Sequence, residues 1–461
     1  MRAHEAGALH GELGAGGPGW LRTPEDVNAL TPQLWPRGVT RAADGALAVD
    51  GLGVRALAEE FGTPAYILDE GDLRSRCREF RAAFPDDDVF YAGKAFLCKA
   101  VVRIIAEEGL NLDVCTGGEL AVALAAGMPA ERIGFHGNNK SVAELDRALH
   151  AGVGRIIVDS FTEIDRLTGL ARERGVRPRV LVRVTVGVEA HTHEFIATAH
   201  EDQKFGFSLA GGAAYEAAVK ILDEGVLELR GLHSHIGSQI FDTNGFEVSA
   251  RRVLALQAQI RDARGVELPE LDLGGGIGIA YTLGDDPATP NDLAKRLGKI
   301  VDGECTALSL TVPRLSIEPG RAIVGPAVFT LYEVGTVKDV DGIRTYVSVD
   351  GGMSDNIRTA LYDASYAATL ASRASTAAPI LARVVGKHCE SGDIVVKDEF
   401  LPADVQPGDL LAVPGTGAYC RSMASNYNHV PRPPVVAVRG GRPREIVRRE
   451  TEDDLLALDV G

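Results

Sequence analysis

The chain has 461 residues, 45% hydrophobic and 24% charged, which is typical of a soluble globular protein with more than one domain. Its formal net charge of −16 argues against nucleic acid or an anionic membrane surface as a partner, because both require concentrated Lys and Arg. No apolar run reaches the ~18 residues of a membrane-spanning helix. The six cysteines are widely spaced, which favours reduced thiols and a cytoplasmic location.

The sequence pattern changes twice near the N-terminus, at about residues 34 and 63. Residues 1–33 begin with a Gly-rich stretch and are expected to form a flexible tail, and residues 34–62 are expected to join a β domain further along the chain. From about Thr63, short apolar runs alternate with amphipathic stretches. The expected strands are Val89–Ala92, Leu110–Val114, Arg132–Phe135, Arg155–Val158, Arg179–Val186, Leu229–His235, Leu271–Leu273 and Arg314–Ile317.

About eight strands, most of them followed by a helix, are typical of an α/β protein with a (β/α)₈ barrel. We place this barrel at residues 63–324. A doubly wound open sheet is the alternative, and the number of strands favours the barrel. Residues 325–461 are expected to form a C-terminal antiparallel β domain, because strand-like runs there are separated by Gly, Pro and Asp with little helix.

Polar residues follow the expected barrel strands one after another. Because the carboxyl ends of barrel strands meet on one face, where the chemistry of this fold is found, we expect these residues to lie close together. In chain order they are Lys94, Asp113, His136, Asp159 with Ser160, Arg183, His235 with Ser238, Gly274–Gly276, and Glu318 with Gly320 and Arg321.

Glycines after the last two strands indicate a phosphate site. Gly274–Gly276 and Gly320 occupy the loops that usually bind phosphate in this fold, and Ser238 adds a hydroxyl donor. A pair of tight turns is the alternative. Across the barrel mouth, Lys94 is suited to a covalent bond with the aldehyde of pyridoxal phosphate, or else to a salt bridge, for example with Asp113.

An acid near the phosphate site completes the expected constellation. Glu318 is placed to pair with a protonated pyridine nitrogen, and a salt bridge to a neighbouring arginine is the alternative. His235 is placed to stack on the ring, although a lone histidine is more often part of a core. His191-x-His193 has metal-ligand composition but no third placed ligand, so no metal site is predicted.

With these residues, the chain resembles the fold-type III pyridoxal-phosphate enzymes of the ornithine/diaminopimelate/arginine decarboxylase family, which have an alanine-racemase-like architecture. The resemblance runs from about Leu34 to Val438. It is carried by the following ordered motifs: Tyr91–Ala95 (YAGKA), His136–Lys140 (HGNNK), Lys204–Gly206 (KFG), His233–Gln239 (HSHIGSQ), Gly274–Gly278 (GGGIG), Glu318–Arg321 (EPGR), Asp350–Arg358 (DGGMSDNIR), Cys389–Asp393 (CESGD) and Gly417–Tyr419 (GAY).

The resemblance implies a homodimer whose active sites are shared across the interface. It implies that Lys94 binds the cofactor covalently, that His235 stacks on its ring and that Glu318 pairs with its nitrogen. It further assigns the phosphate to Ser238, Gly275, Gly276, Gly320 and Tyr419, includes Arg321 among the cofactor-binding residues, and assigns the substrate to Arg321, Arg358, Tyr362, Tyr419 and the partner's Glu390. The partner's Cys389 is implied to donate a proton. One departure from the family is Asp363, which follows Tyr362 where Gly is frequent.

The distal residues point to one substrate. A substrate with a second amino-acid head requires a cation for its carboxylate and an anion for its ammonium, and Arg358 with Arg321 and Glu390 supply them. The expected reaction is decarboxylation of meso-2,6-diaminopimelate to L-lysine, the last step of lysine biosynthesis. The alternatives are a decarboxylase of arginine, ornithine or carboxynorspermidine, a non-catalytic pyridoxal-phosphate-binding homologue, and an amino-acid racemase of the same architecture.

Overall fold

The computed structural model describes residues 18–187, 203–340 and 343–461. By their internal contacts these residues form two compact units. Of the described residues, unit 1 comprises 18–75, 279–286, 324–340 and 343–461, and unit 2 comprises 76–187, 203–278 and 287–323. No helix in the described part of the chain is both long enough and apolar enough to cross a membrane.

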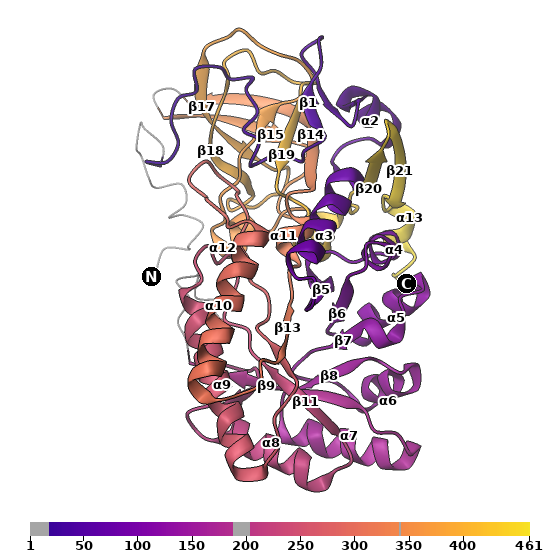
Figure 1. The fold of residues 1–461 in the computed structure, drawn as a ribbon. Helices are drawn as coiled ribbons and strands as arrows, with labels where there is room; N and C mark the ends of the chain where they lie inside the picture. Colours follow the sequence, from indigo (N-terminus) through magenta and orange to yellow (C-terminus); the bar gives the residue numbers. More distant parts are fainter. Residues whose placement is uncertain (1–17, 188–202, 341–342) are drawn as a thin grey trace, which may run out of the picture. The chain divides into compact units, whose positions relative to one another are not determined.

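Unit 2 is built around a closed ring of parallel strands (Figure 1). Ile317 of the last strand pairs with Val89 of the first, and Ile157 pairs with Leu181, so no edge remains open in the ring. The predicted (β/α)₈ barrel is therefore confirmed, and the open-sheet alternative is wrong. The ring strands are β5 (Asp88–Ala92), β6 (Asn111–Val114), β7 (Ile133–Phe135), β8 (Arg155–Val158), β9 (Arg179–Thr185), β11 (Glu228–His233), β12 (Glu270–Asp272) and β13 (Arg314–Ile317), with the short β10 (Phe207–Ser208) added beside β9.

Helices follow the strands and lie outside the ring, as α5 to α8 show in Figure 1. They are α3 (Glu70–Ala83), α4 (Lys99–Glu107), α5 (Gly117–Ala126), α6 (Val142–Ala151), α7 (Phe161–Arg174), α8 (Ala213–Glu224), α9 (Asn244–Arg264), α10 (Pro290–Leu308) and α11 (Arg321–Val324).

Capping residues keep the loops at the carboxyl ends of the strands short. Thr116, Ser141 and Ser160 each accept a hydrogen bond from a backbone N–H in the first turn of α5, α6 and α7. At the other end, Gly127 and Gly152 adopt left-handed conformations that terminate α5 and α6. Asp113, His136 and Asp159 are thereby each fixed shortly before the capped start of a helix.

Unit 1 contains a mixed β-sheet and a small three-stranded sheet. The main sheet has the order β18-β17-β15-β14-β4-β20-β21, and β19 pairs with β14 and β16. The strands are β4 (Ala65–Asp69), β14 (Val328–Val340), β15 (Arg344–Val349), β16 (Thr369–Leu370), β17 (Pro379–Val385), β18 (Ile394–Pro402), β19 (Leu410–Pro414), β20 (Val435–Arg439) and β21 (Arg442–Val447). The short helices are α12 (Arg358–Tyr362) and α13 (Glu452–Leu456).

Two expectations about this unit need correction. The β domain is not wholly antiparallel, because β15 pairs in parallel with β17 and β20 pairs in parallel with β4. The boundary expected at residue 63 lies later, at Ser75, because β4 is hydrogen-bonded between β14 and β20 instead of entering the barrel.

The segment before the barrel packs within unit 1 but forms its own sheet of β1 (Val39–Arg41), β2 (Leu47–Val49) and β3 (Leu52–Gly53), followed by α2 (Val54–Phe61). Trp35 and Leu47 are buried in one apolar cluster with Phe329 of the main sheet. This common core explains why an N-terminal segment and the C-terminal third of the chain form one unit.

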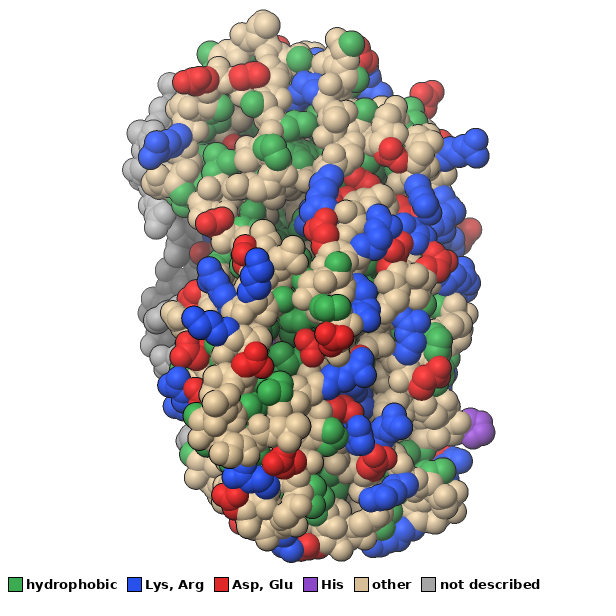
Figure 2. Space-filling model, in the orientation of Figure 1, with side chains coloured by type: hydrophobic (Ala, Val, Ile, Leu, Met, Phe, Trp, Pro, Cys, Tyr) green, Lys and Arg blue, Asp and Glu red, His purple; other side chains and the backbone are tan. Residues whose placement is uncertain are grey.

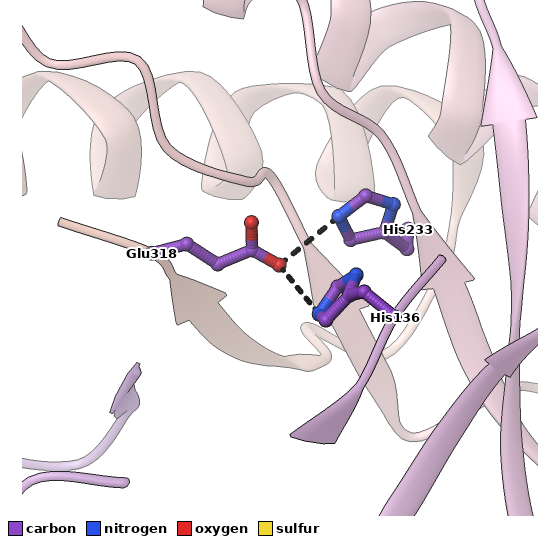
Figure 3. Close-up of side chains that lie close together, drawn as sticks. All are labelled: His136, His233 and Glu318. Atoms are coloured by element: carbon purple, nitrogen blue, oxygen red, sulfur yellow. Dashed lines mark hydrogen bonds and ion pairs between the residues drawn. The ribbon is translucent and has the colours of Figure 1, made fainter. Parts of the chain in front are cut away.

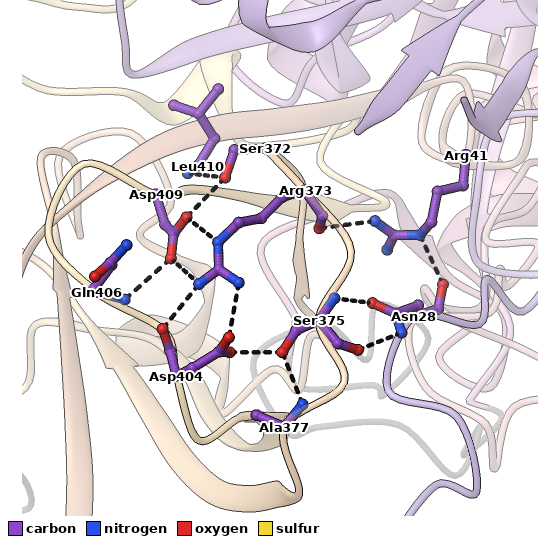
Figure 4. A network of polar contacts seen from close by, with 10 residues as sticks. All are labelled: Asn28, Arg41, Ser372, Arg373, Ser375, Ala377, Asp404, Gln406, Asp409 and Leu410. Atoms are coloured by element: carbon purple, nitrogen blue, oxygen red, sulfur yellow. Dashed lines mark hydrogen bonds and ion pairs between the residues drawn. The ribbon is translucent and has the colours of Figure 1, made fainter. Parts of the chain in front are cut away.

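The expected flexible tail, residues 1–33, is not free over its described part. Asn28 donates to the carbonyl of Ser375 at 2.8 Å and accepts from the Ser375 N–H at 2.8 Å. Arg41 in turn donates to the Asn28 carbonyl at 2.9 Å (Figure 4). The contact between Asn28 and Ser375 could not be predicted from the sequence, because the two residues are 347 positions apart.

The Ala/Ser-rich segment after α12 is held by a buried carboxylate. Asp409 accepts hydrogen bonds from the Ser372 hydroxyl, from two nitrogens of Arg373 and from the Gln406 N–H, at 2.8–3.0 Å (Figure 4). Arg373 also donates to Asp404 at 2.9 Å. This network fixes the connection between β16 and β17.

On the face drawn in Figure 2, basic and acidic side chains are interspersed. The net negative charge is therefore not gathered into a single acidic patch on that face.

We expect Asp409→Asn to destabilise unit 1 by about 2 kcal/mol, because it removes the charge that a half-buried arginine requires. The measurement is the midpoint of chemical denaturation followed by circular dichroism. Asp286→Asn, at an exposed aspartate, is the matched control. Equal midpoints for the two variants would show that the network contributes no stability.

Candidate active site

A cavity of about 170 Å³ lies at the carboxyl ends of the barrel strands, entirely within unit 2. The expected residues Lys94, Asp113, His136, Arg183, His235 and Glu318 all line it. It is also lined by Cys115, Glu119, Phe205 and His233, to which the sequence had assigned no role.

Lys94 lies in the single 3₁₀ turn (Gly93–Ala95) that follows β5, and its side chain is exposed at the cavity. Among the described residues, no side chain forms a hydrogen bond or ion pair with its amine. The alternative of a salt bridge to Asp113 is not observed, because Asp113 contacts His136 instead. An amine in this position is accessible to a ligand that enters the cavity.

Glu318 is held by two histidines (Figure 3). The Nε2 atoms of His136 and His233 lie 3.2 Å and 3.1 Å from the same Glu318 oxygen, Oε1. Glu318 directly follows β13, whereas His233 ends β11 and His136 directly follows β7. The alternative of an arginine partner for Glu318 is therefore wrong, since its hydrogen-bond partners are imidazoles.

These contacts control the charge of Glu318. Burial alone raises the pKa of a carboxyl group, but His136 and His233 outweigh it and hold the pKa of Glu318 well below its usual value. The carboxylate is therefore ionised at neutral pH.

His235 is neutral, in contrast to the ionised Glu318. Burial, assisted by the positive charge of Lys94, holds the pKa of His235 well below its usual value, so the imidazole is neutral. Its Nδ1 accepts a hydrogen bond from the Gly275 N–H at 3.2 Å. The neutral ring therefore carries its proton on Nε2.

The glycine loops allow a very close approach of three backbone segments. A Cβ atom on Gly275 would lie 2.3 Å from the Glu318 carbonyl oxygen, and one on Gly276 would lie 2.2 Å from the Gly237 carbonyl oxygen. A Cβ on Gly320 would lie 2.8 Å from the Ala92 carbonyl oxygen. The glycines are thus required for packing. Because the Gly275 N–H is donated to His235, its role toward an anion stays a prediction.

Donors for an anion lie beside these glycines. The Arg321 guanidinium, at the start of α11, donates to the Ser238 hydroxyl at 2.7 Å. Arg321 is buried and Ser238 is partly buried. A guanidinium and a hydroxyl next to glycine backbone form a donor set that suits phosphate.

Several cavity residues were missed by the sequence reasoning. His233 stands within a strand, and nothing in its neighbourhood indicates a partner 85 residues away. Phe205 forms a wall of the cavity and stacks on the Arg183 guanidinium at 4.4 Å. Burial and Glu119 raise the pKa of Cys115 to about 12, so this thiol is protonated.

Except for Arg321, which lies in unit 2, the expected distal residues belong to unit 1. Arg358, in α12, is buried, donates to the Tyr366 hydroxyl at 2.6 Å and lies over the Tyr281 ring at 4.8 Å. Tyr362 ends the same helix and is partly buried. Asp363, which replaces the frequent Gly of the family, adopts a left-handed conformation with φ of 55°, which Asp tolerates.

Cys389 and Glu390 lie in the connection between β17 and β18. Cys389 is exposed and Glu390 is partly buried. Tyr419 is partly buried and has a positive φ of 63°. The paired histidines His191 and His193 lie outside the described residues.

Comparisons with known proteins identify the family of the chain. Residues 70–325 match the family model described as pyridoxal-dependent decarboxylase, pyridoxal binding domain. A diaminopimelate decarboxylase of Mycobacterium tuberculosis is 59% identical over 94% of this chain and 98% of that protein. One of Bacillus subtilis is 47% identical over 90% and 95%.

Solved structures agree as well. The crystal structure of diaminopimelate decarboxylase from M. jannaschii in complex with L-lysine superimposes with a TM-score of 0.87 and 32% sequence identity, over 93% of this chain and 99% of that one. The chain belongs to the pyridoxal-dependent decarboxylase family.

Proposed function

We propose that this chain decarboxylates meso-2,6-diaminopimelate to L-lysine and CO₂ with pyridoxal 5′-phosphate as its cofactor. The observation that carries the proposal is a cavity that holds an ionised carboxylate, Glu318, a neutral imidazole, His235, and an amine, Lys94, that is unpaired among the described residues. The reaction named for the relatives, at up to 59% identity over nearly the full length, supports the choice of substrate.

The residues of the cavity fit the cofactor. Bound pyridoxal phosphate supplies an aldehyde that bonds to amines and an electron-poor ring that accepts the electron pair left when CO₂ departs. Lys94 would bind the aldehyde, and Ser238, Arg321 and the backbone of Gly276 and Gly320 would hold the phosphate. Gly275 and Tyr419 complete the proposed phosphate contacts.

Glu318 and His235 would tune the ring. An ionised Glu318 stabilises a protonated ring nitrogen by charge pairing, and a positive nitrogen increases the electron demand of the ring. A neutral His235 stacks on the ring face without opposing that charge. Both residues are held in these protonation states by contacts already described.

Two arginines, two tyrosines and a carboxylate of the partner would recognise the far end of the substrate. Arg358 and Arg321 would bind the distal carboxylate, with Tyr362 and Tyr419 beside them, and the partner's Glu390 would bind the distal ammonium. The buried, tyrosine-flanked Arg358 is held in one orientation, which favours bidentate binding of a carboxylate.

We further infer a cytoplasmic homodimer in which the partner's Cys389 protonates Cα. The exposure of Cys389 on a connection between two strands supports this role, because a thiol there is accessible from outside its own unit.

Incubation of the purified protein with pyridoxal phosphate and meso-diaminopimelate should release CO₂ and form L-lysine in equal amounts. Ornithine and arginine should react at least about 100-fold less efficiently, because they leave the buried distal arginine unpaired. Amino-acid analysis measures the product. Preferential reaction with ornithine or arginine, or exchange of the Cα hydrogen without CO₂ release, would contradict the proposal.

Lys94→Ala should abolish the visible absorbance band of the reconstituted protein, because no other described lysine lines the cavity. Lys99→Ala, at an exposed lysine five positions later, should retain the band. Absorbance spectra after gel filtration provide the measurement. A band that persists in Lys94→Ala would show that the cofactor is bound elsewhere.

Cys389→Ser should lower kcat by about 100-fold while the cofactor band persists, as expected for loss of a proton donor. Cys98→Ser is the matched control, because Cys98 is the N-cap of α4, where Ser is favoured. Mixing Lys94→Ala with Cys389→Ser subunits should raise activity well above that of either variant alone, since heterodimers then contain one intact site. No restoration after verified subunit exchange would exclude a site shared between subunits.

A further inference from the structure

His136 lies between two carboxylates, and all three side chains line the cavity. Its Nε2 is 3.2 Å from Glu318 Oε1 and 3.3 Å from Asp113 Oδ1. All three side chains are nearly buried, with exposed fractions of 11% for His136 and 9% for each carboxylate. A single N–H shared by two anions in a low-dielectric site is strongest when the imidazole is charged.

His233 donates to Glu318 as well. Its Nε2 lies 3.1 Å from Glu318 Oε1. Its Nδ1 is buried and has no hydrogen-bond partner among the described residues, so a proton on that atom would be an unsatisfied buried donor. His136, whose Nε2 lies between two carboxylates, is therefore the imidazole that we assign as the cation of the cluster.

The charges around the cluster support this assignment. Burial lowers the pKa of His136, but Glu318 and Asp113 outweigh it and raise that pKa to about 10. Asp272 is a third buried carboxyl group that interacts with Glu318. Arg183 interacts with Glu318 at longer range and is paired with Asp159 at 3.9 Å. His136 is thus the cation in direct contact with Glu318.

The contacts also leave one oxygen of Glu318 available. Both imidazoles bond to Oε1, and Figure 3 shows the second oxygen without a partner among the residues drawn. Oxygen Oε2 is the one left to accept a hydrogen bond from a ligand in the cavity.

We propose that His136 is a positioning residue whose imidazolium, shared between Asp113 and Glu318, keeps Glu318 ionised and oriented toward the ring nitrogen of the cofactor. This inference rests on the proposed function. In this proposal His136 does not contact the substrate, but it sets the charge of Glu318, which would contact the cofactor.

The test compares the affinity for pyridoxal phosphate of His136→Gln and of the control His150→Gln, at an exposed histidine of α6. Glutamine keeps a hydrogen-bond donor but loses the charge. We expect the dissociation constant to rise about 10- to 100-fold in His136→Gln, the size of a lost charge-assisted hydrogen bond. The visible band should shift or weaken, and His150→Gln should match the unsubstituted protein.

A second substitution separates charge from packing. In His136→Gln, Asp113 and Glu318 repel each other without an intervening cation, so adding Asp113→Asn should recover part of the lost affinity. A role in packing alone predicts that the double variant binds no better than His136→Gln, and that result would overturn the inference.

A measurement on the unsubstituted apoprotein covers the case in which His136→Gln does not fold. Nitrogen chemical shifts should show His136 as an imidazolium at about pH 8, where an ordinary histidine is neutral. A neutral His136, or equal cofactor affinity in His136→Gln and His150→Gln, would overturn the inference alone. Absence of any cofactor binding by the unsubstituted protein would instead overturn the proposed function.

Discussion

The site depends on one carboxylate oxygen that accepts hydrogen bonds from two imidazoles. Glu318 Oε1 accepts hydrogen bonds from His136, which follows β7, and from His233, which ends β11, so three strands of the barrel are tied together at their carboxyl ends. Burial alone would have driven the carboxyl group toward its neutral form. The two imidazoles reverse that tendency and stabilise an anion in the wall of the cavity, where it would favour a bound cation.

The neighbouring groups have complementary protonation states. Burial disfavours the charged form of both Glu318 and His235, and it keeps His235 neutral. The hydrogen bond from the Gly275 N–H to Nδ1 places the proton of His235 on Nε2. Lys94 is the exposed member, on a turn held between β5 and α4. A closed barrel achieves this arrangement because every strand delivers one residue to the same face.

Much of the fold was predictable from the sequence, because its signals are local. The alternation of strands and helices, and a polar residue after each strand, predicted the barrel and the cavity residues Lys94, His235 and Glu318. Long-range pairing was not predictable. The sequence pattern places β4 in the barrel, but the strand pairs with β14 and β20 of unit 1. Asn28 was expected to lie in a flexible tail, but it forms hydrogen bonds with Ser375. His233 looked like an ordinary strand residue for the same reason, since its partner is distant in sequence.

The central claim is that the amine of Lys94 is the attachment point of the cofactor. The direct measurement is reduction with borohydride of the protein loaded with pyridoxal phosphate, followed by proteolysis and mass spectrometry. The account predicts one pyridoxyl group, located on the peptide that contains Lys94. A modified peptide from another part of the chain, or no modified peptide, would contradict it.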